Sequence, residues 1–455
     1  MPDMRVCCRW TLVAAALFVA GCSTVAPPPS TPSVVTAEAA SFHTGADAPR
    51  VADAIRQQLE RSGKTLQDLS ASDLNTYGGV LLAAGRLDDA NQAFTALDKK
   101  QPGDKDTLKT LALLAQARDD GTFEARVNAL VQRYPDDPET LNLKAGLLAS
   151  KGDAAGASAA WTASLAKAET REALEGLAGL AMDAGKPSEA LPYADRALQH
   201  DPDDNTWALH ARVKAEQGRA AEALQDLNQA VALAPDDPWH RLDRARVEWR
   251  SLRDAPAAEA DLELAVKADS SNVLSWSLLS EVLESQDKAQ PAYDALLQSV
   301  RLRPDFRPSY PSGAMLAFRL KDYAHAVDFA QKAAQDYPGE YGFPLVEFLS
   351  LQALGRAPEA KAALDRARPR YAANAPVMEL FRFLLTPTSD SYLNTTLQQE
   401  KRESTRVRLK YYQGCWYAQT GADASARAAF EEVAASKLES IPEIPAARAW
   451  LNHGN

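Results

Sequence analysis

A unit of about 34 residues recurs along most of the sequence, and this period constrains the fold more than any other feature. The stretch from residue 205 to 238 shows its plan, with two halves of helical periodicity on either side of Gly218. In the second half Ala223 and Leu227 lie four residues apart and share one helical face. Pro235 and the aspartates after it then stop the second helix. The unit is therefore a helix–turn–helix.

The small residue near the start of the second helix measures the repeat. At intervals of 33–35 residues it falls at Ala90, Phe123 (a poor match), Ala157, Ala190, Ala223, Ala258, Ala292, Ala326 and Ala360. Ala426 follows 66 residues later, and a degenerate unit with Leu393 and Leu397 fills that gap. In its period and its helical hairpins the chain resembles the tetratricopeptide repeat family.

This resemblance implies an all-α fold, a tetratricopeptide superhelix (α-solenoid) of about ten or eleven helical hairpins with a C-terminal capping helix. A single hairpin cannot bury its apolar face, so neighbouring hairpins must stack and form a continuous core. We expect the solenoid over residues 49–372, with an amphipathic lead-in helix at its start. A degenerate repeat, the last repeat and the capping helix are expected within residues 373–455.

The overall charge restricts the partners. The chain of 455 residues has a formal net charge of −11 and no basic block. This balance argues against nucleic acid as the main partner and against electrostatic docking on anionic lipid headgroups.

The N-terminus is typical of a secreted lipoprotein. Residues 1–21 have a start containing Arg5 and Arg9 and an apolar run too short to span a bilayer, which predicts a signal peptide. The run ends in VAGC, which resembles a bacterial lipobox and implies cleavage before Cys22 and a covalent lipid (palmitate) on it. Ser23 then implies transport to the outer membrane, with the protein on its periplasmic face. The alternative is an ordinary signal peptide with an incidental cysteine.

Residues 22–48 are rich in Pro, Ser, Thr and Ala and lack helical periodicity. This composition predicts a lipid-anchored flexible linker that holds the solenoid away from the membrane. Pro49 suits a first helical position, and the amphipathic segment 51–59 then forms the lead-in helix.

Cysteine usage agrees with this reading. Of four cysteines, Cys7 and Cys8 leave with the signal and Cys22 carries the lipid, so Cys415 has no disulfide partner in the mature chain. Cys415 lies among aromatic residues in a helical segment, which favours a buried small hydrophobe over a nucleophile.

Mapped onto the repeat, the face of the first helix of each hairpin supplies the candidate partner-binding groove. These candidates are Asn142, Glu175, Arg212, Asp243, Arg250, Glu281, Glu284, Met315, Phe318 and Leu349. Their mixed charges specify no single ligand charge, and a solvated helix face is the alternative for each. The more apolar stretch around Met315 and Phe318 suits a partner helix or extended peptide, or else the core between repeats.

The last 80 or so residues resemble the end of the NlpI-type tetratricopeptide lipoproteins of the bacterial outer membrane. The likeness is the order of a degenerate unit, the segment YYQGCWYAQTGADASARAAF, a spacer and AARAWL. It implies an adaptor that brings peptidoglycan-cutting enzymes and proteases together. The present chain is longer than expected for that family, so those partners do not transfer.

The sequence carries no motif for catalysis. HExxH, GxSxG, GxxxxGK[ST] and CxxC are all missing, so we predict no enzyme, no metal and no cofactor beyond the lipid on Cys22. An enzyme would have to use the carboxylate pair Glu281 and Glu284. We instead expect a lipid-anchored periplasmic scaffold whose groove binds envelope proteins or peptides. The alternative is a pilotin-like or export-machine assembly lipoprotein for pili or exopolysaccharide secretion.

Overall fold

The computed structural model describes residues 33–39, 47–387, 390–438 and 441–453, which are helices joined by turns. The predicted signal peptide and Cys22 lie outside the described residues. None of the described helices has both the length and the apolar character that a membrane crossing requires. By internal contacts the chain divides into two units, one ending at Pro235 and one beginning at Asp236.

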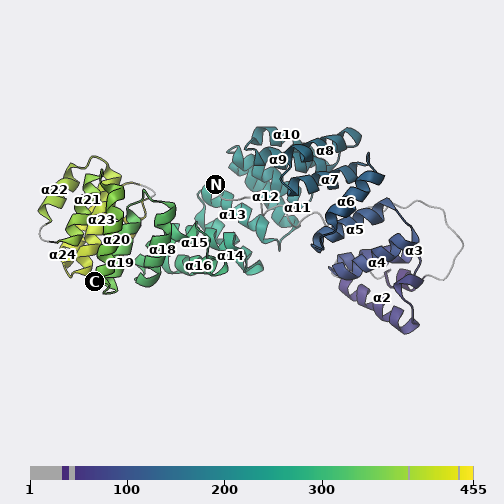
Figure 1. Ribbon diagram of the computed structural model, residues 1–455, viewed down its shortest axis with the longest axis horizontal. Coiled ribbons are helices and arrows are strands. Elements are labelled where there is room, and N and C mark those ends of the chain that lie inside the picture. Colours follow the sequence, from purple (N-terminus) through teal and green to yellow (C-terminus); the bar gives the residue numbers. More distant parts are fainter. Residues whose placement is uncertain (1–32, 40–46, 388–389, 439–440, 454–455) are drawn as a thin grey trace. The chain divides into compact units, whose positions relative to one another are not determined.

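Helices α3 to α24 pair in chain order, so their 22 helices make eleven hairpins, as the period predicts (Figure 1). In the first unit the elements are α1 Val34–Ala39, α2 Ala48–Ser62, the short 3₁₀ helix Leu66–Asp68, α3 Ala71–Ala83, α4 Leu87–Lys100, α5 Lys105–Ala117, α6 Phe123–Arg133, α7 Pro138–Ser150, α8 Ala154–Lys167, α9 Arg171–Asp183, α10 Pro187–Ala197, α11 Asp204–Glu216 and α12 Ala220–Leu233.

The second unit continues the pattern and ends in a helix outside the hairpins. Its elements are α13 Pro238–Arg250, α14 Ala255–Ala268, α15 Val273–Ser285, α16 Ala289–Leu302, α17 Ser309–Arg319, α18 Tyr323–Asp336, α19 Gly342–Ala353, α20 Ala357–Tyr371, α21 Ala375–Leu385, α22 Ser391–Gln399, α23 Glu403–Gln419, α24 Asp423–Ala434 and α25 Glu443–His453. Helix α25 packs on α23 and α24, which is the predicted capping contact.

The repeat residues pack as the period requires. Ala90, Ala157, Ala190 and Ala223 are fully buried where the two helices of a hairpin meet, and Leu227 is 1% exposed. The turn aspartates cap the following helices, since Asp137 accepts from the backbone N–H of Thr140 at 2.9 Å.

The prediction of a flexible linker over residues 22–48 is wrong for residues 34–39. Residues 34–39 form the short helix α1, which packs against α2 and α3. Val35 is fully buried, and the Ser33 hydroxyl donates to the Asp73 carboxylate. The first hairpin of a stack has an apolar side with no preceding repeat, and α1 with α2 covers it. A six-residue helix is too short to produce a periodic signal in the sequence.

The C-terminal repeats are joined by a buried ion-pair network. Arg408 in α23 donates to both Glu340 oxygens at 2.5 and 3.1 Å and to Glu443 in α25 at 2.9 Å. The Tyr412 hydroxyl also donates to Glu443, at 3.0 Å, and the Glu443 side chain is fully buried. Burial works against the charge of Arg408, but the hydrogen bond to Glu340 and the charge of Glu443 raise the pKa of its guanidinium above the usual value. The network therefore ties α23 to the start of α19 and to α25.

Candidate functional site

All ten predicted groove residues lie on the first helix of a hairpin, but the structure separates them into three groups. Asn142 and Glu175 bond to the next repeat within the first unit. Met315, Phe318 and Leu349 are buried. The others keep a solvent-accessible surface, namely Arg212 in the first unit and Asp243, Arg250, Glu281 and Glu284 in the second.

Asn142 and Glu175 occupy equivalent positions one repeat apart, and each bonds to the helix that starts the next hairpin. The Asn142 amide donates to the hydroxyl of Thr170, the N-cap of α9, at 3.0 Å. The Thr206 hydroxyl in α11 donates to the Glu175 carboxylate at 2.5 Å. Both residues therefore hold neighbouring repeats together, whatever else they contact.

Glu175 has a shifted pKa. Burial, opposed by the Thr206 hydrogen bond, raises the pKa of its carboxyl to about 7. The nearby charge of Asp203 adds to the rise, and that of Arg171 reduces it. The Glu175 carboxyl therefore changes its charge near neutral pH.

We expect Glu175→Gln to stabilise the protein by about 1–2 kcal/mol at pH 8.5 and by much less at about pH 4.5, where the Glu175 carboxyl is protonated in the folded protein. The pKa in the folded state, about 7, lies above the ordinary value of 4.5. The stability that the proton contributes is thus complete below the ordinary pKa and is lost as pH rises through about 7. Glutamine keeps the acceptor for Thr206 and never ionises. Urea unfolding at the two pH values measures the difference, with Glu216→Gln, at an exposed position on α11, as the control. A stability difference that does not change with pH would contradict the expectation.

The assignment of Met315, Phe318 and Leu349 to a partner groove is wrong. Their exposed fractions are 6%, 7% and 0%. Helix α23 of the same chain packs against α19 and α21, and its Tyr412 reaches Met315 of α17 (Figure 1). The Tyr412 hydroxyl lies 3.8 Å from the Met315 sulfur, and the Gln419 amide donates to the Leu349 carbonyl at 3.2 Å. The apolar stretch is therefore the core between distant repeats, which was the alternative reading.

A charged, accessible face remains on the second unit, and we call it the α13–α17 face. It consists of Asp243, Arg246, Arg250, Glu281, Glu284, Asp287 and Arg319. Asp243 pairs with Arg246 at 2.6 Å on α13, Arg250 of α13 reaches Glu281 of α15 at 3.6 Å, and Asp287 pairs with Arg319 at the end of α17 at 2.8 Å. Three successive repeats thus contribute one continuous set of charges.

The two carboxyls of α15 lie in surroundings poorer in water than their exposure alone suggests. The Glu281 side chain keeps 44% of its surface exposed, yet burial raises its pKa, against the opposing effect of Arg250. Burial also raises the pKa of Glu284, opposed by Arg319 and by a hydrogen bond with Ser312 and reinforced by Glu281.

Arg246, Asp287 and Arg319 were missed by the sequence reading, although the period contained the signal for one of them. The intervals Arg212 to Arg246 and Arg246 to Glu281 are 34 and 35 residues, so Arg246 occupies the same repeat position as two predicted residues. Arg319 ends its helix and appears on the face only through its pairing with Asp287.

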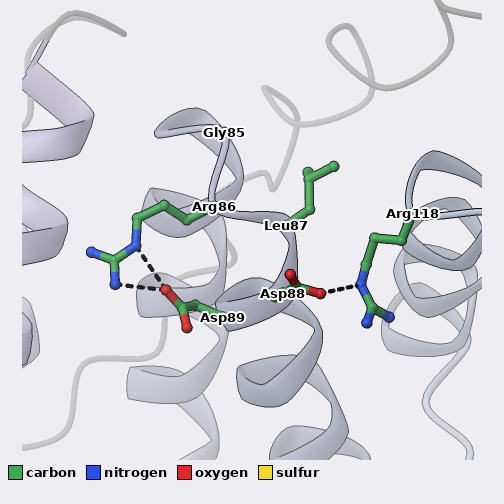
Figure 2. Close-up of a pocket in the computed structure, with 6 residues that line it drawn as sticks. All are labelled: Gly85, Arg86, Leu87, Asp88, Asp89 and Arg118. Atoms are coloured by element: carbon green, nitrogen blue, oxygen red, sulfur yellow. Dashed lines mark hydrogen bonds and ion pairs between the residues drawn. The ribbon is translucent and has the colours of Figure 1, made fainter. Parts of the chain in front are cut away.

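A polar hollow of about 600 Å³ lies in the first unit, where the turn between α3 and α4 approaches the end of α5. Figure 2 shows its lining of Gly85, Arg86, Leu87, Asp88, Asp89 and Arg118. Arg86 pairs with Asp89 at 2.6 Å, and Arg118 pairs with Asp88 at 2.7 Å. The Arg118 pair joins two neighbouring repeats, whereas Arg86 pairs within its own turn and with Asp53 of α2 at 2.9 Å. Both guanidinium groups are thus engaged, and the hollow is a junction between helices.

Cys415 is buried, as predicted, with 7% of its surface exposed. Burial raises the pKa of its thiol to about 12, so the thiolate is essentially unpopulated at neutral pH. The residue packs as a small hydrophobe.

Comparison with known proteins agrees with this geometry. A family model of the tetratricopeptide repeat matches residues 181–243. The chain is 31% identical over 253 residues to cellulose synthase operon protein C of Xanthomonas axonopodis pv. citri (strain 306). This match covers 53% of the chain but only 15% of that protein, so the chain spans a small part of its relative.

Two solved structures align with the chain, and the first of them shares its fold. The APC/C hetero-tetramer Cut9–Hcn1 aligns with a TM-score of 0.52 at 16% identity, over 67% of this chain and 59% of the other. PilF of Pseudomonas aeruginosa aligns with a TM-score of 0.42 at 18% identity, over 48% of this chain and 96% of the other.

The eleven hairpins, the family-model match over residues 181–243 and the Cut9–Hcn1 alignment together identify an all-α solenoid of tetratricopeptide repeats. Stacked repeats of this class expose an extended surface that binds other proteins or peptides. The chain therefore has the architecture of a protein-interaction scaffold.

Proposed function

We propose that the protein is a non-catalytic scaffold of the cell envelope, lipid-anchored through Cys22 to the periplasmic face of the outer membrane. Its α13–α17 face binds another envelope protein, such as a peptidoglycan-remodelling enzyme or a protease. The VAGC sequence at residues 19–22 supports the anchor. Residues 23–33, which precede α1, would connect the lipid on Cys22 to the first repeats.

One observation carries the choice of face. Its charged side chains remain accessible, with 59% of the Arg250 side chain and 44% of Glu281 exposed, whereas α23 of the same chain covers the equivalent surface of the following repeats. Charged groups fixed by rigid helices provide specificity for a partner.

Photo-crosslinking in cells tests the face. We expect a photoreactive residue at the exposed position Ser285 in α15 to give a protein adduct of defined mass. The same probe at Lys361, an exposed position on the second helix α20, should give none. Equal adducts at both positions, or none at Ser285, would contradict the proposed face.

The anchor is tested separately. Cys22→Ser should abolish palmitate labelling and move the protein from the membrane fraction to the soluble fraction. A Cys22→Ser protein that stays in the membrane fraction with its label intact would exclude the lipid site.

A second candidate function is favoured by the relative. Cellulose synthase operon protein C is named for a polysaccharide synthesis operon, so an assembly or export role for exopolysaccharide is the alternative. Deletion of the gene distinguishes the two. Loss of polymer export with unchanged cell-wall hydrolase levels favours the export role, and the converse favours the adaptor.

A further inference from the structure

The charges of the α13–α17 face do not balance. It carries four carboxylates and three guanidinium groups, and each of the three arginines is paired with a carboxylate, at 2.6 Å for Arg246, 3.6 Å for Arg250 and 2.8 Å for Arg319. The carboxylate left over is Glu284, whose hydrogen-bonding neighbour is the neutral hydroxyl of Ser312. Arg319 influences Glu284 at a distance, but its guanidinium is bonded to Asp287.

The surroundings make this imbalance significant. Arg319 is held in place, because only 9% of its side chain is exposed, and therefore cannot turn freely from Asp287 to Glu284. The protein around Glu284 removes part of its hydration, and the nearby Glu281 adds repulsion. An ionised carboxylate in such a place gains more from a new cation than one in open water does.

We infer that the α13–α17 face binds a polypeptide segment with a lysine or arginine side chain whose cation pairs with Glu284. This inference rests on the proposed scaffold function and adds the chemistry of the partner. The added cation would bring the face to four positive and four negative charges, while a partner carboxylate at the same place would meet Glu281 and Glu284 and be repelled.

Peptide selection on the full-length, detergent-solubilised protein tests the inference. A display library of random 12-residue peptides is selected on the wild type, on Glu284→Gln and on Glu284→Lys. The matched control is Glu263→Gln, which neutralises an exposed carboxylate on the second helix α14. Thermal unfolding of each variant checks that the fold is intact, and all buffers contain a chelator.

We expect lysine or arginine to be enriched among the peptides that bind the wild type and the control. A selected synthetic peptide should bind Glu284→Gln about tenfold more weakly, and the affinity for the wild type should fall as salt rises. Selection on Glu284→Lys should lose the basic residue.

Two outcomes overturn the inference and are distinguishable. Peptides that bind the wild type without basic residues, or that bind Glu284→Gln equally well, reject the partner chemistry and leave the scaffold function standing. No enriched peptide on any form of the protein rejects the peptide-binding face itself, and the proposed function with it.

Discussion

Replacing Arg408 with methionine should destabilise the second unit by about 3–5 kcal/mol, because it leaves a buried charge without its partner. The Arg408 side chain is 20% exposed and bonds to Glu340 and to the fully buried Glu443. Methionine preserves most of the length and apolar volume of the side chain but offers no donor. Denaturant unfolding monitored by tryptophan fluorescence measures the loss.

An exposed-arginine control and a double variant show whether the loss of stability comes from the unpaired charge of Glu443. Arg356→Met removes an arginine of the same unit whose side chain is 47% exposed and whose partner Glu359 is 58% exposed, so we expect a change below about 1 kcal/mol. Adding Glu443→Gln to Arg408→Met should recover part of the loss, since glutamine still accepts from Tyr412 but carries no charge. Equal effects of Arg408→Met and Arg356→Met would show that the network does not stabilise the fold.

Gly176→Ala should destabilise the first unit by about 1–3 kcal/mol, even though alanine is the better helix former. A Cβ at Gly176 in α9 would lie 2.2 Å from the indole ring of Trp161, far inside contact distance. The Trp161 side chain is 9% exposed and packed in α8, so it has little room to move. The strain therefore outweighs the gain in helix propensity of about 1 kcal/mol.

The same helix provides the matched control. A Cβ at Gly179 would meet nothing within 4 Å, so we expect Gly179→Ala to stabilise the protein by about 0.5–1 kcal/mol. If the two glycine-to-alanine substitutions change the stability in opposite directions, the effect of side-chain packing is distinguished from that of helix propensity. Thermal unfolding of the two variants measures both, and a stabilising Gly176→Ala would contradict the close packing of α8 and α9.

Local and periodic features were readable from the sequence. The spacing of Ala90, Ala157 and Ala223 located the hairpins, and aspartates such as Asp137 marked the starts of helices. The predicted lead-in helix over residues 51–59 lies within α2, which runs from Ala48 to Ser62. These features depend on neighbours in the chain, so a single sequence contains the information for them.

Contacts between distant repeats were not readable in this way. Met315 and Tyr412 are 97 residues apart in the sequence. No local sequence pattern at either position indicates that the two side chains contact each other. The apolar stretch at Met315 satisfies the pattern of an open groove and that of a core equally well. Similarly, nothing at Asn142 or Glu175 indicates that the next repeat supplies their hydrogen-bond partner.

By itself the sequence determined the all-α repeat fold, because a hairpin with one apolar face can remove that face from water only by stacking. It also led to the prediction that the first helix of each hairpin supplies the open face. Only the tertiary structure decided which outward faces stay open, because α23 closes one stretch and leaves the charges around Glu281 and Glu284 accessible. That choice depends on the free energy of burying apolar surface between segments far apart in the chain, which no local pattern records.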